Sequence, residues 1–244
     1  MARDLGPQAN FRSVYVAGYL SAAIVMALCS MRPNFMYDAD DEHALQWSGR
    51  SRLCYWLWQL HFVRRVFESA YVHKFSRSHM PRAYLLRSCA YHALFAFLIG
   101  YPLCSPRFIS GALSFDRMGV LAATWALAEM GNFYFHRRLA TARRGKERVD
   151  TMEWPFTHIL CPNYGAEILS WLCFSMLSGL LASYLFLVTA WLVMSSRAGR
   201  KVEQLQGGTG KLSAMGVPLL DVAFVGTLLG LGRRKVPQEW LPKL

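Results

Sequence analysis

The sequence has few charged residues, and acidic residues are the scarcer kind. Charged residues make up 17% of the 244 positions, and 15 acidic side chains stand against 27 basic ones, a net charge of +12. Hydrophobic residues account for 54% of the chain, and its mean hydropathy is slightly positive. This composition excludes an ordinary soluble domain of this size. Because no soluble basic domain remains, a nucleic-acid partner is not expected.

Metal-binding and secretory signatures are also missing. The six cysteines show no CxxC or comparable spacing, so no metal site is predicted, and His73 and His79 are interpreted as interfacial or packing residues. The first residues, MARDLGPQANFRS, have no apolar core directly behind them, which argues against a cleaved secretory signal. Asp4 interrupts a mitochondrial presequence pattern. We therefore expect the first apolar run to stay as a membrane anchor.

Several apolar runs are present, each near the roughly 20 residues that a helix needs to cross a bilayer. Helices are expected at 14–29, in CYWLWQLHFVRRVFESAYVHKF, at 84–104 and at 118–136. In the second of these segments Arg64 and Glu68 lie four residues apart and could pair on one helix face, turned away from lipid. The predicted fold is all-α, a polytopic transmembrane helical bundle of about 6–7 membrane segments.

The run 166–194 is long for one membrane span and short for two. Gly179, within LSGLLAS, offers a break. The basic segments 74–87, 137–148 and SSRAGRK fall on one side of the membrane only if this run crosses twice. We therefore expect two helices here, the first starting near FTHILCPNY. Residues 1–212 are assigned to the membrane bundle, and 213–244 to an apolar and basic C-terminal extension.

Polar side chains recur at four-residue spacing where two predicted helices meet the membrane boundary. One helix carries such a pair followed by an arginine, and the next repeats the spacing with a tyrosine inside it. The set comprises Asn132, His136, Arg143, Asn163, Tyr164 and Glu167. Taken singly, each is better explained as a helix cap or an interhelical hydrogen bond. Taken together, they favour a pocket for ribose hydroxyls, an amide and phosphates.

Two of these stretches, GNFYFHRRLATAR and FTHILCPNYGAEILSW, resemble the C-terminal domain of the steroid 5α-reductase family. The very-long-chain trans-2-enoyl-CoA reductase branch is most similar, because VHKFS and MP also occur upstream. The resemblance implies a membrane bundle that holds NADPH and reduces the double bond of an enoyl-CoA or a steroid enone. It implies cofactor binding by Asn132, His136, Arg143, Asn163, Glu167 and Arg200. It also implies that Tyr164 is the proton donor.

The chain departs from the family pattern in three places. Phe62 follows His61 where the family has tyrosine, so a phenol that could donate a proton is missing. Ala140 stands where a second arginine is usual, which removes a charge-assisted contact to phosphate. Gly199 and Val202 replace the histidine and tyrosine of the motif that closes the family domain.

These losses favour a catalytically degenerate member that serves as a structural or accessory subunit of a larger membrane complex. Its expected partners are membrane lipids, a bound phospholipid and other membrane subunits, contacted through the tail GRRKVPQEWLPKL. Such a subunit could lie in the mitochondrial inner membrane, in a respiratory complex. The alternative is an active NADPH-dependent trans-2-enoyl-CoA reductase of very-long-chain fatty acid elongation in the endoplasmic reticulum, with Tyr164 catalytic.

Overall fold

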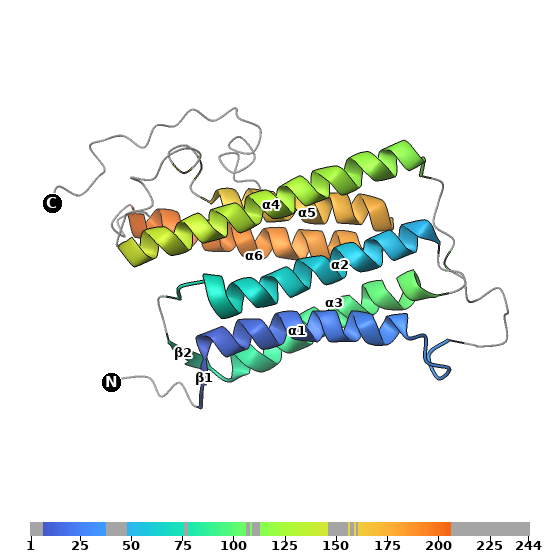
Figure 1. The fold of residues 1–244 in the computed structure, drawn as a ribbon. Coiled ribbons are helices and arrows are strands. Elements are labelled where there is room, and N and C mark those ends of the chain that lie inside the picture. Colours follow the sequence, from blue (N-terminus) through green and yellow to red (C-terminus); the bar gives the residue numbers. More distant parts are fainter. Residues whose placement is uncertain are drawn as a thin grey trace.

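The fold was analysed in a computed structural model, which describes residues 7–37, 48–75, 78–105, 108, 113–145, 156, 159 and 161–205. Six α-helices run side by side in these ranges (Figure 1). They are α1 (Phe11–Ser30), α2 (Gly49–Phe67), α3 (Ala83–Cys104), α4 (Phe115–Gly145), α5 (Pro162–Ser178) and α6 (Leu181–Leu205). A π-helical turn, η2 (Glu68–Val72), extends α2, and a short strand β1 (Gln8–Asn10) pairs antiparallel with β2 (His79–Pro81). The all-α prediction is confirmed, and the predicted extension 213–244 lies outside the described residues.

The helices begin where the sequence supplies capping residues. Asn10 ends β1, and its Oδ1 accepts hydrogen bonds from the backbone N–H of Arg12 at 2.9 Å and of Ser13 at 3.4 Å. Ser48 caps α2 in the same way, accepting from Ser51 N at 3.0 Å. Pro162 opens α5, where its missing N–H costs no intrahelical bond.

The run 166–194 forms two helices, as predicted. α5 ends at Ser178 and is capped by Gly179, which adopts a left-handed conformation with φ 68°, and α6 begins at Leu181. Most L-residues avoid this conformation, so glycine is the natural choice at the break. The C-terminal ends of α2, α4 and α6 consequently lie at one end of the bundle, beside β1 and β2 (Figure 1). The basic residues that follow or end these helices therefore share that end.

Helix contacts close a ring. α1 packs against α2 and α3, α2 against α5, α5 against α6, and α6 against α3, while α4 lies outside the ring against α5. The α1–α3 contact is close because Gly18 faces Ser88, where a Cβ on the glycine would collide with the serine Oγ. Ser21 Oγ also donates to Cys89 O at 3.2 Å. Small residues of this kind let membrane helices approach one another.

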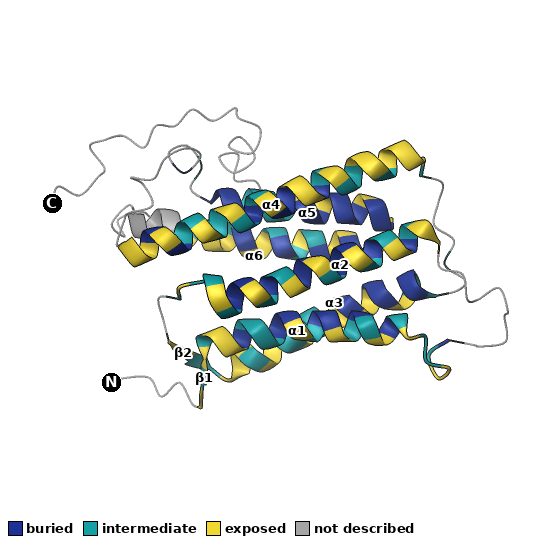
Figure 2. Cartoon of the chain, viewed as in Figure 1, coloured by how far each residue is buried: buried dark blue, intermediate teal, exposed yellow. Residues whose placement is uncertain are grey.

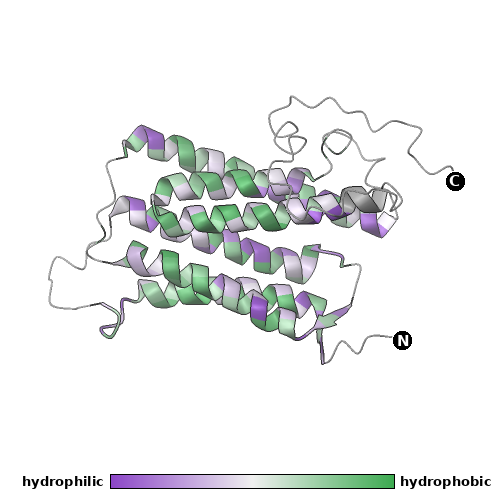
Figure 3. Cartoon of the chain, turned by 180° about the vertical axis from the view of Figure 1, so that it is seen from behind, coloured by the Kyte–Doolittle hydropathy of each residue, from purple (hydrophilic) through white to green (hydrophobic). Residues whose placement is uncertain are grey.

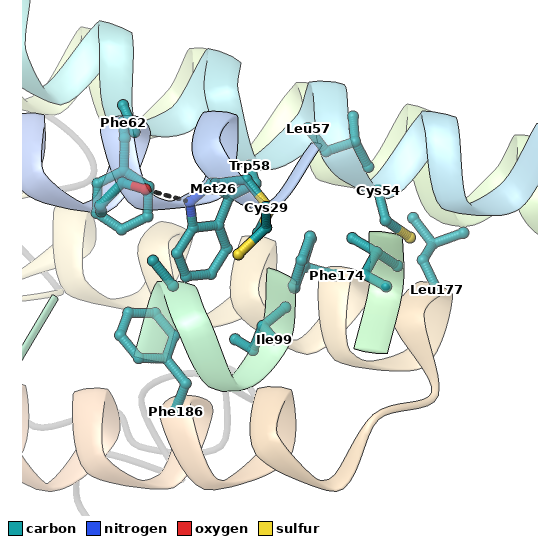
Figure 4. Packing of buried hydrophobic residues seen from close by; sticks show 14 of the residues in the cluster. Met26, Cys29, Cys54, Leu57, Trp58, Phe62, Ile99, Phe174, Leu177 and Phe186 are labelled. Carbon is teal, nitrogen blue, oxygen red and sulfur yellow. Dashed lines mark hydrogen bonds between the residues drawn. The ribbon is translucent and has the colours of Figure 1, made fainter. Parts of the chain in front are cut away.

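Away from the β-strands the ring is filled by apolar side chains, among them Met26, Trp58, Ile99, Phe174 and Leu177 (Figure 4). Trp58 Nε1 donates to the backbone oxygen of Ala22 at 3.3 Å, so its polar atom is satisfied in the core. None of the six cysteines, which all lie in described ranges, forms a disulfide. All but Cys89 are buried.

The outer surfaces of the helices are apolar. Exposed positions run along the outsides of the helices (Figure 2), and hydrophobic residues dominate their central parts (Figure 3). On α1, for example, Leu20, Ile24 and Leu28 are exposed. Three helical segments are long and apolar enough to cross a membrane: Phe11–Ser30, Ala83–Cys104 and Leu181–Arg200. The chain is thus a membrane protein with apolar helices, and the count of about 6–7 spans remains a prediction.

Replacing Gly179 by alanine should destabilise the junction of α5 and α6. The new Cβ would be strained at φ 68° and would lie 2.9 Å from Arg50 Nη2, which reaches the last carbonyls of α5. We expect Gly179→Ala to lower the free energy of unfolding by about 1–2 kcal/mol. The matched control is Gly199→Ala inside α6, where a Cβ meets open space and should raise stability by about 0.5–1 kcal/mol. Thermal unfolding in detergent measures both, and equal melting temperatures would contradict the assigned role.

Candidate functional site

A cavity of about 1120 Å³ lies inside the helix bundle, towards the end that carries β1 and β2. All six helices contribute to its wall. The first turns of α1, α3 and α5 face the later turns of α2, α4 and α6 across it. The volume is slightly above the roughly 300–1,000 Å³ that small-molecule and cofactor sites occupy.

The structure brings the predicted site residues together at this cavity. The residues that line it directly are His136, Arg143, Asn163, Tyr164, Glu167 and Arg200. Asn132 lies behind the wall, fully buried. Its Nδ2 donates to Asn163 O at 2.7 Å and to Glu167 Oε2 at 3.3 Å. The four-residue spacing on α4 and α5 therefore brings these side chains to one cavity, and their role in binding a ligand stays a prediction.

Asn132 also connects this wall to α2, because its Oδ1 accepts from Arg64 Nη1 at 3.0 Å. Arg64 in turn donates through Nε to Glu129 Oε2 at 2.8 Å and through Nη1 to Glu68, which confirms the predicted pair. His61 Nδ1 lies 2.9 Å from Glu129 Oε1. Buried charges of this kind are tolerated only when they are paired and hydrogen-bonded.

A second buried pair places Arg65 at the cavity. Its Nη1 donates to Glu68 Oε2 at 2.6 Å, and its Nη2 lies 3.8 Å from Glu167 Oε2 and 3.0 Å from the hydroxyl oxygen of Tyr19. Glu129, Arg65 and Tyr19 therefore belong to the site as well, although the four-residue spacing does not include them. One feature of the sequence could have indicated this network: Glu129 lies within an apolar stretch of α4, and a buried carboxylate needs a partner.

Most of the charged side chains on the cavity wall are basic. They are Arg65, Lys74, Arg87, Arg143, Arg197 and Arg200, while Glu167 is the one carboxylate among the described lining residues. Arg143 is held in place by its Nη1, which donates to Lys74 O at 2.6 Å. A wall of this composition attracts a polyanion, such as the phosphates of a dinucleotide or of coenzyme A.

One buried acceptor on the wall, Asn163 Oδ1, receives no hydrogen bond from any described residue. Leaving such an atom unpaired costs about 1–3 kcal/mol, which a ligand N–H or O–H would recover. The carboxamide and ribose groups of NADPH carry donors of this kind, so these residues fit that cofactor.

Comparison with known proteins places this site in a family. The 3-oxo-5-alpha-steroid 4-dehydrogenase family matches residues 78–206. A putative enoyl-CoA reductase of Trypanosoma brucei brucei is 34% identical over 203 residues, which cover 82% of this chain and 67% of that protein. A probable very-long-chain enoyl-CoA reductase of Caenorhabditis elegans is 28% identical over 201 residues, 79% of this chain and 65% of that protein.

The chain belongs to the steroid 5α-reductase family, in its enoyl-CoA reductase branch. A further relative, named trans-2,3-enoyl-CoA reductase-like, from Homo sapiens, is 26% identical over 207 residues, 82% of this chain and 57% of that protein. The chain thus spans about two thirds or less of the length of these relatives.

Two of the departures from the family pattern lie on the cavity wall. Phe62 is buried there, with its ring centroid 5.0 Å from that of His61, and it carries no hydroxyl. Ala140 also lines the cavity, so an arginine at this position, as in the family pattern, would extend into the cavity. Gly199 lies in α6 with open space around its Cα, and nothing is described of the Val202 side chain.

A second cluster brings together possible metal ligands that the sequence spacing did not suggest. One ligand atom from each of Glu68, His73 and His136 lies within 4.8 Å of the others. However, Glu68 already binds Arg64 and Arg65, whose charges oppose a cation at this point. The rings of His73 and His136 pack with centroids 4.6 Å apart. His73 is therefore a packing residue as expected, and it also lines the cavity.

Acidification should destabilise the fold through His73. Burial, and next the positive charge of Arg65, lower the pKa of His73 from 6.5 to about 3. Below pH 6.5 the unfolded chain takes up a proton that the folded chain refuses, so stability falls as the pH drops from there towards 3. When the pH falls from 7 to 5, the free energy of unfolding should therefore decrease by about 2 kcal/mol more in the wild type than in His73→Gln.

Thermal unfolding in detergent at the two pH values measures this difference. His79→Gln is the matched control, since His79 is exposed on β2, and it should keep the wild-type pH dependence. A His73→Gln protein that loses as much stability on acidification as the wild type would contradict the assignment.

Proposed function

We propose that this protein is an NADPH-dependent reductase of trans-2-enoyl-CoA thioesters. The observation that carries the proposal is that Asn163 and Glu167 meet on one basic cavity wall, hydrogen-bonded to Asn132 behind it, while Asn163 Oδ1 finds no donor among the described residues. The relatives' names point to the same reaction. We further propose that its substrates carry very long acyl chains and that it lies in the endoplasmic reticulum membrane.

Different parts of the cavity wall suit the polar groups of the cofactor and the apolar acyl chain of the substrate. Arg143, Arg197 and Arg200 lie where they can hold phosphate groups, and Asn163 Oδ1 can accept from an amide. NADPH, when bound, supplies the hydride that adds to the β-carbon. Apolar side chains such as Val14, Phe186 and Val193 line other parts of the wall and suit an acyl chain.

Tyr164 is the candidate proton donor. Its side chain lines the cavity at the first turn of α5, next to Asn163. As the β-carbon gains a hydride, negative charge develops on the thioester enolate, and the Tyr164 O–H can deliver its proton to the α-carbon. A proton from bulk solvent then restores the Tyr164 hydroxyl, so the reduction takes up one hydride and one proton in all.

Purified protein should oxidise NADPH when a trans-2-enoyl-CoA is added, and Tyr164→Phe should slow that rate by about 100-fold or more. Loss of absorbance by NADPH measures the rate. Tyr184→Phe is the matched control: Tyr184 lies on α6, 38% exposed, and its loss should leave the rate unchanged. Absence of both turnover and dinucleotide binding would refute the proposal.

A second candidate function is that of an accessory subunit in a larger membrane complex, without catalysis. Phe62 and Ala140 favour it, because both reduce the polar groups available at the cavity. In that case a phospholipid would occupy the cavity, with its headgroup at the basic wall. The mitochondrial inner membrane is the expected location.

The accessory-subunit hypothesis is tested by removing the residues after Lys211. On a native gel, the full chain should migrate within a large membrane assembly, and the truncated chain should be released from it. The release is expected because residues 212–244 hold the apolar and basic extension that would bind partners. Migration as the same small species before and after truncation would count against this function.

A further inference from the structure

Tyr19 presents a hydrogen-bond donor to the cavity. It lies on α1, lines the cavity and is 8% exposed. Arg65 Nη2 donates to its hydroxyl oxygen at 3.0 Å. A guanidinium has donors and no acceptor, so the phenol oxygen is the acceptor in this bond, and the phenol hydrogen must point elsewhere. Within the described ranges, no acceptor for that hydrogen lies at hydrogen-bonding distance.

Arg65 fixes the position of this phenol. The guanidinium is itself held by Glu68, at 2.6 Å, and faces Glu167, at 3.8 Å. It lies 5.1 Å from the centroid of the Tyr19 ring, while His92 packs edge-on against the same ring with centroids 5.3 Å apart. Because the bond to Arg65 is charge-assisted, it also polarises the phenol and strengthens it as a donor.

Three side chains near Tyr19 do not supply an equivalent hydroxyl donor. Phe62, whose ring centroid lies 6.1 Å from that of Tyr19, has no hydroxyl. His92 Nδ1 lies 2.7 Å from Ser88 O and donates to it, which makes the other ring nitrogen of a neutral histidine an acceptor. The hydroxyl of Tyr91 is engaged with Thr189 Oγ1 at 2.9 Å. Tyr19 therefore takes the donor position on this part of the wall.

We propose that the Tyr19 O–H donates a hydrogen bond to the carbonyl oxygen of the bound enoyl thioester. This inference rests on the proposed reductase function and adds a group that binds the substrate at its reacting end. When the β-carbon gains a hydride, the C=C electron pair forms a double bond between the α-carbon and the carbonyl carbon, and the C=O π pair moves to the oxygen, which gives an enolate. The Tyr19 hydrogen bond stabilises that charge, and its proton stays on Tyr19 while Tyr164 protonates the α-carbon.

The infrared carbonyl band of a bound trans-2-enoyl-CoA, isotope-labelled at the thioester carbon, tests the contact without any dinucleotide. In the wild-type protein the band should shift to lower frequency than in free ligand, because a hydrogen bond weakens the C=O bond. In Tyr19→Phe it should move back towards the free value, and affinity should fall by about three- to tenfold. In the double variant with Tyr19→Phe and Phe62→Tyr the band should again lie at lower frequency than in free ligand, because Phe62→Tyr places a phenol beside the lost one.

Tyr15→Phe is the matched control. Tyr15 lies one turn earlier on α1, lines the same cavity and stacks on Phe11 and Phe75, with centroids 5.3 and 5.5 Å away. It should keep the wild-type band and affinity. If the carbonyl band of the thioester bound to Tyr19→Phe has the same frequency as in the wild-type protein, the Tyr19 assignment is wrong and the reductase proposal stands. If the wild type binds no enoyl thioester, the reductase proposal fails, and the Tyr19 assignment fails with it.

Discussion

The architecture depends on the need to pair two neighbouring arginines within a bundle of apolar helices. Arg64 and Arg65 lie on α2, where Arg65 is buried and Arg64 is partly buried, so each needs acceptors from Glu68 in η2 and from neighbouring helices. Glu129 and Asn132 on α4 satisfy Arg64, and Glu167 on α5 faces Arg65. This pairing ties together α2, α4 and α5, three of the six helices that line the cavity.

The same pairing shapes the cavity. Since Arg65 is held at the wall by Glu68 and Glu167, it places both a positive charge and the Tyr19 phenol against the space where a ligand would lie. Asn132 holds Asn163 and Glu167 from behind, and no described residue donates a hydrogen bond to Asn163 Oδ1. The polar network thus acts as the support of the site, and the groups in front of it are left for recognition.

The two halves of the bundle have different roles: the apolar half is structural, and the polar half carries the candidate site. Trp58, Phe174 and Ile99 fill one half tightly and need no ligand. The other half, near β1 and β2, carries the cavity and the basic ends of α2, α4 and α6. A basic membrane boundary of this kind suits anionic headgroups and anionic ligands alike, which is why composition could not choose between a lipid and a dinucleotide.

The sequence alone determined the helices, the break at Gly179 and the shared site of Asn132, Asn163 and Glu167, because these follow from local rules: apolar run length, glycine conformation and a four-residue helical period. It could not determine that Glu129 binds His61 and Arg64, or that Arg65 reaches Tyr19 on α1. Those contacts join residues 46 to 68 positions apart. Their existence depends on how the ring of helices closes, and only the tertiary structure decided that.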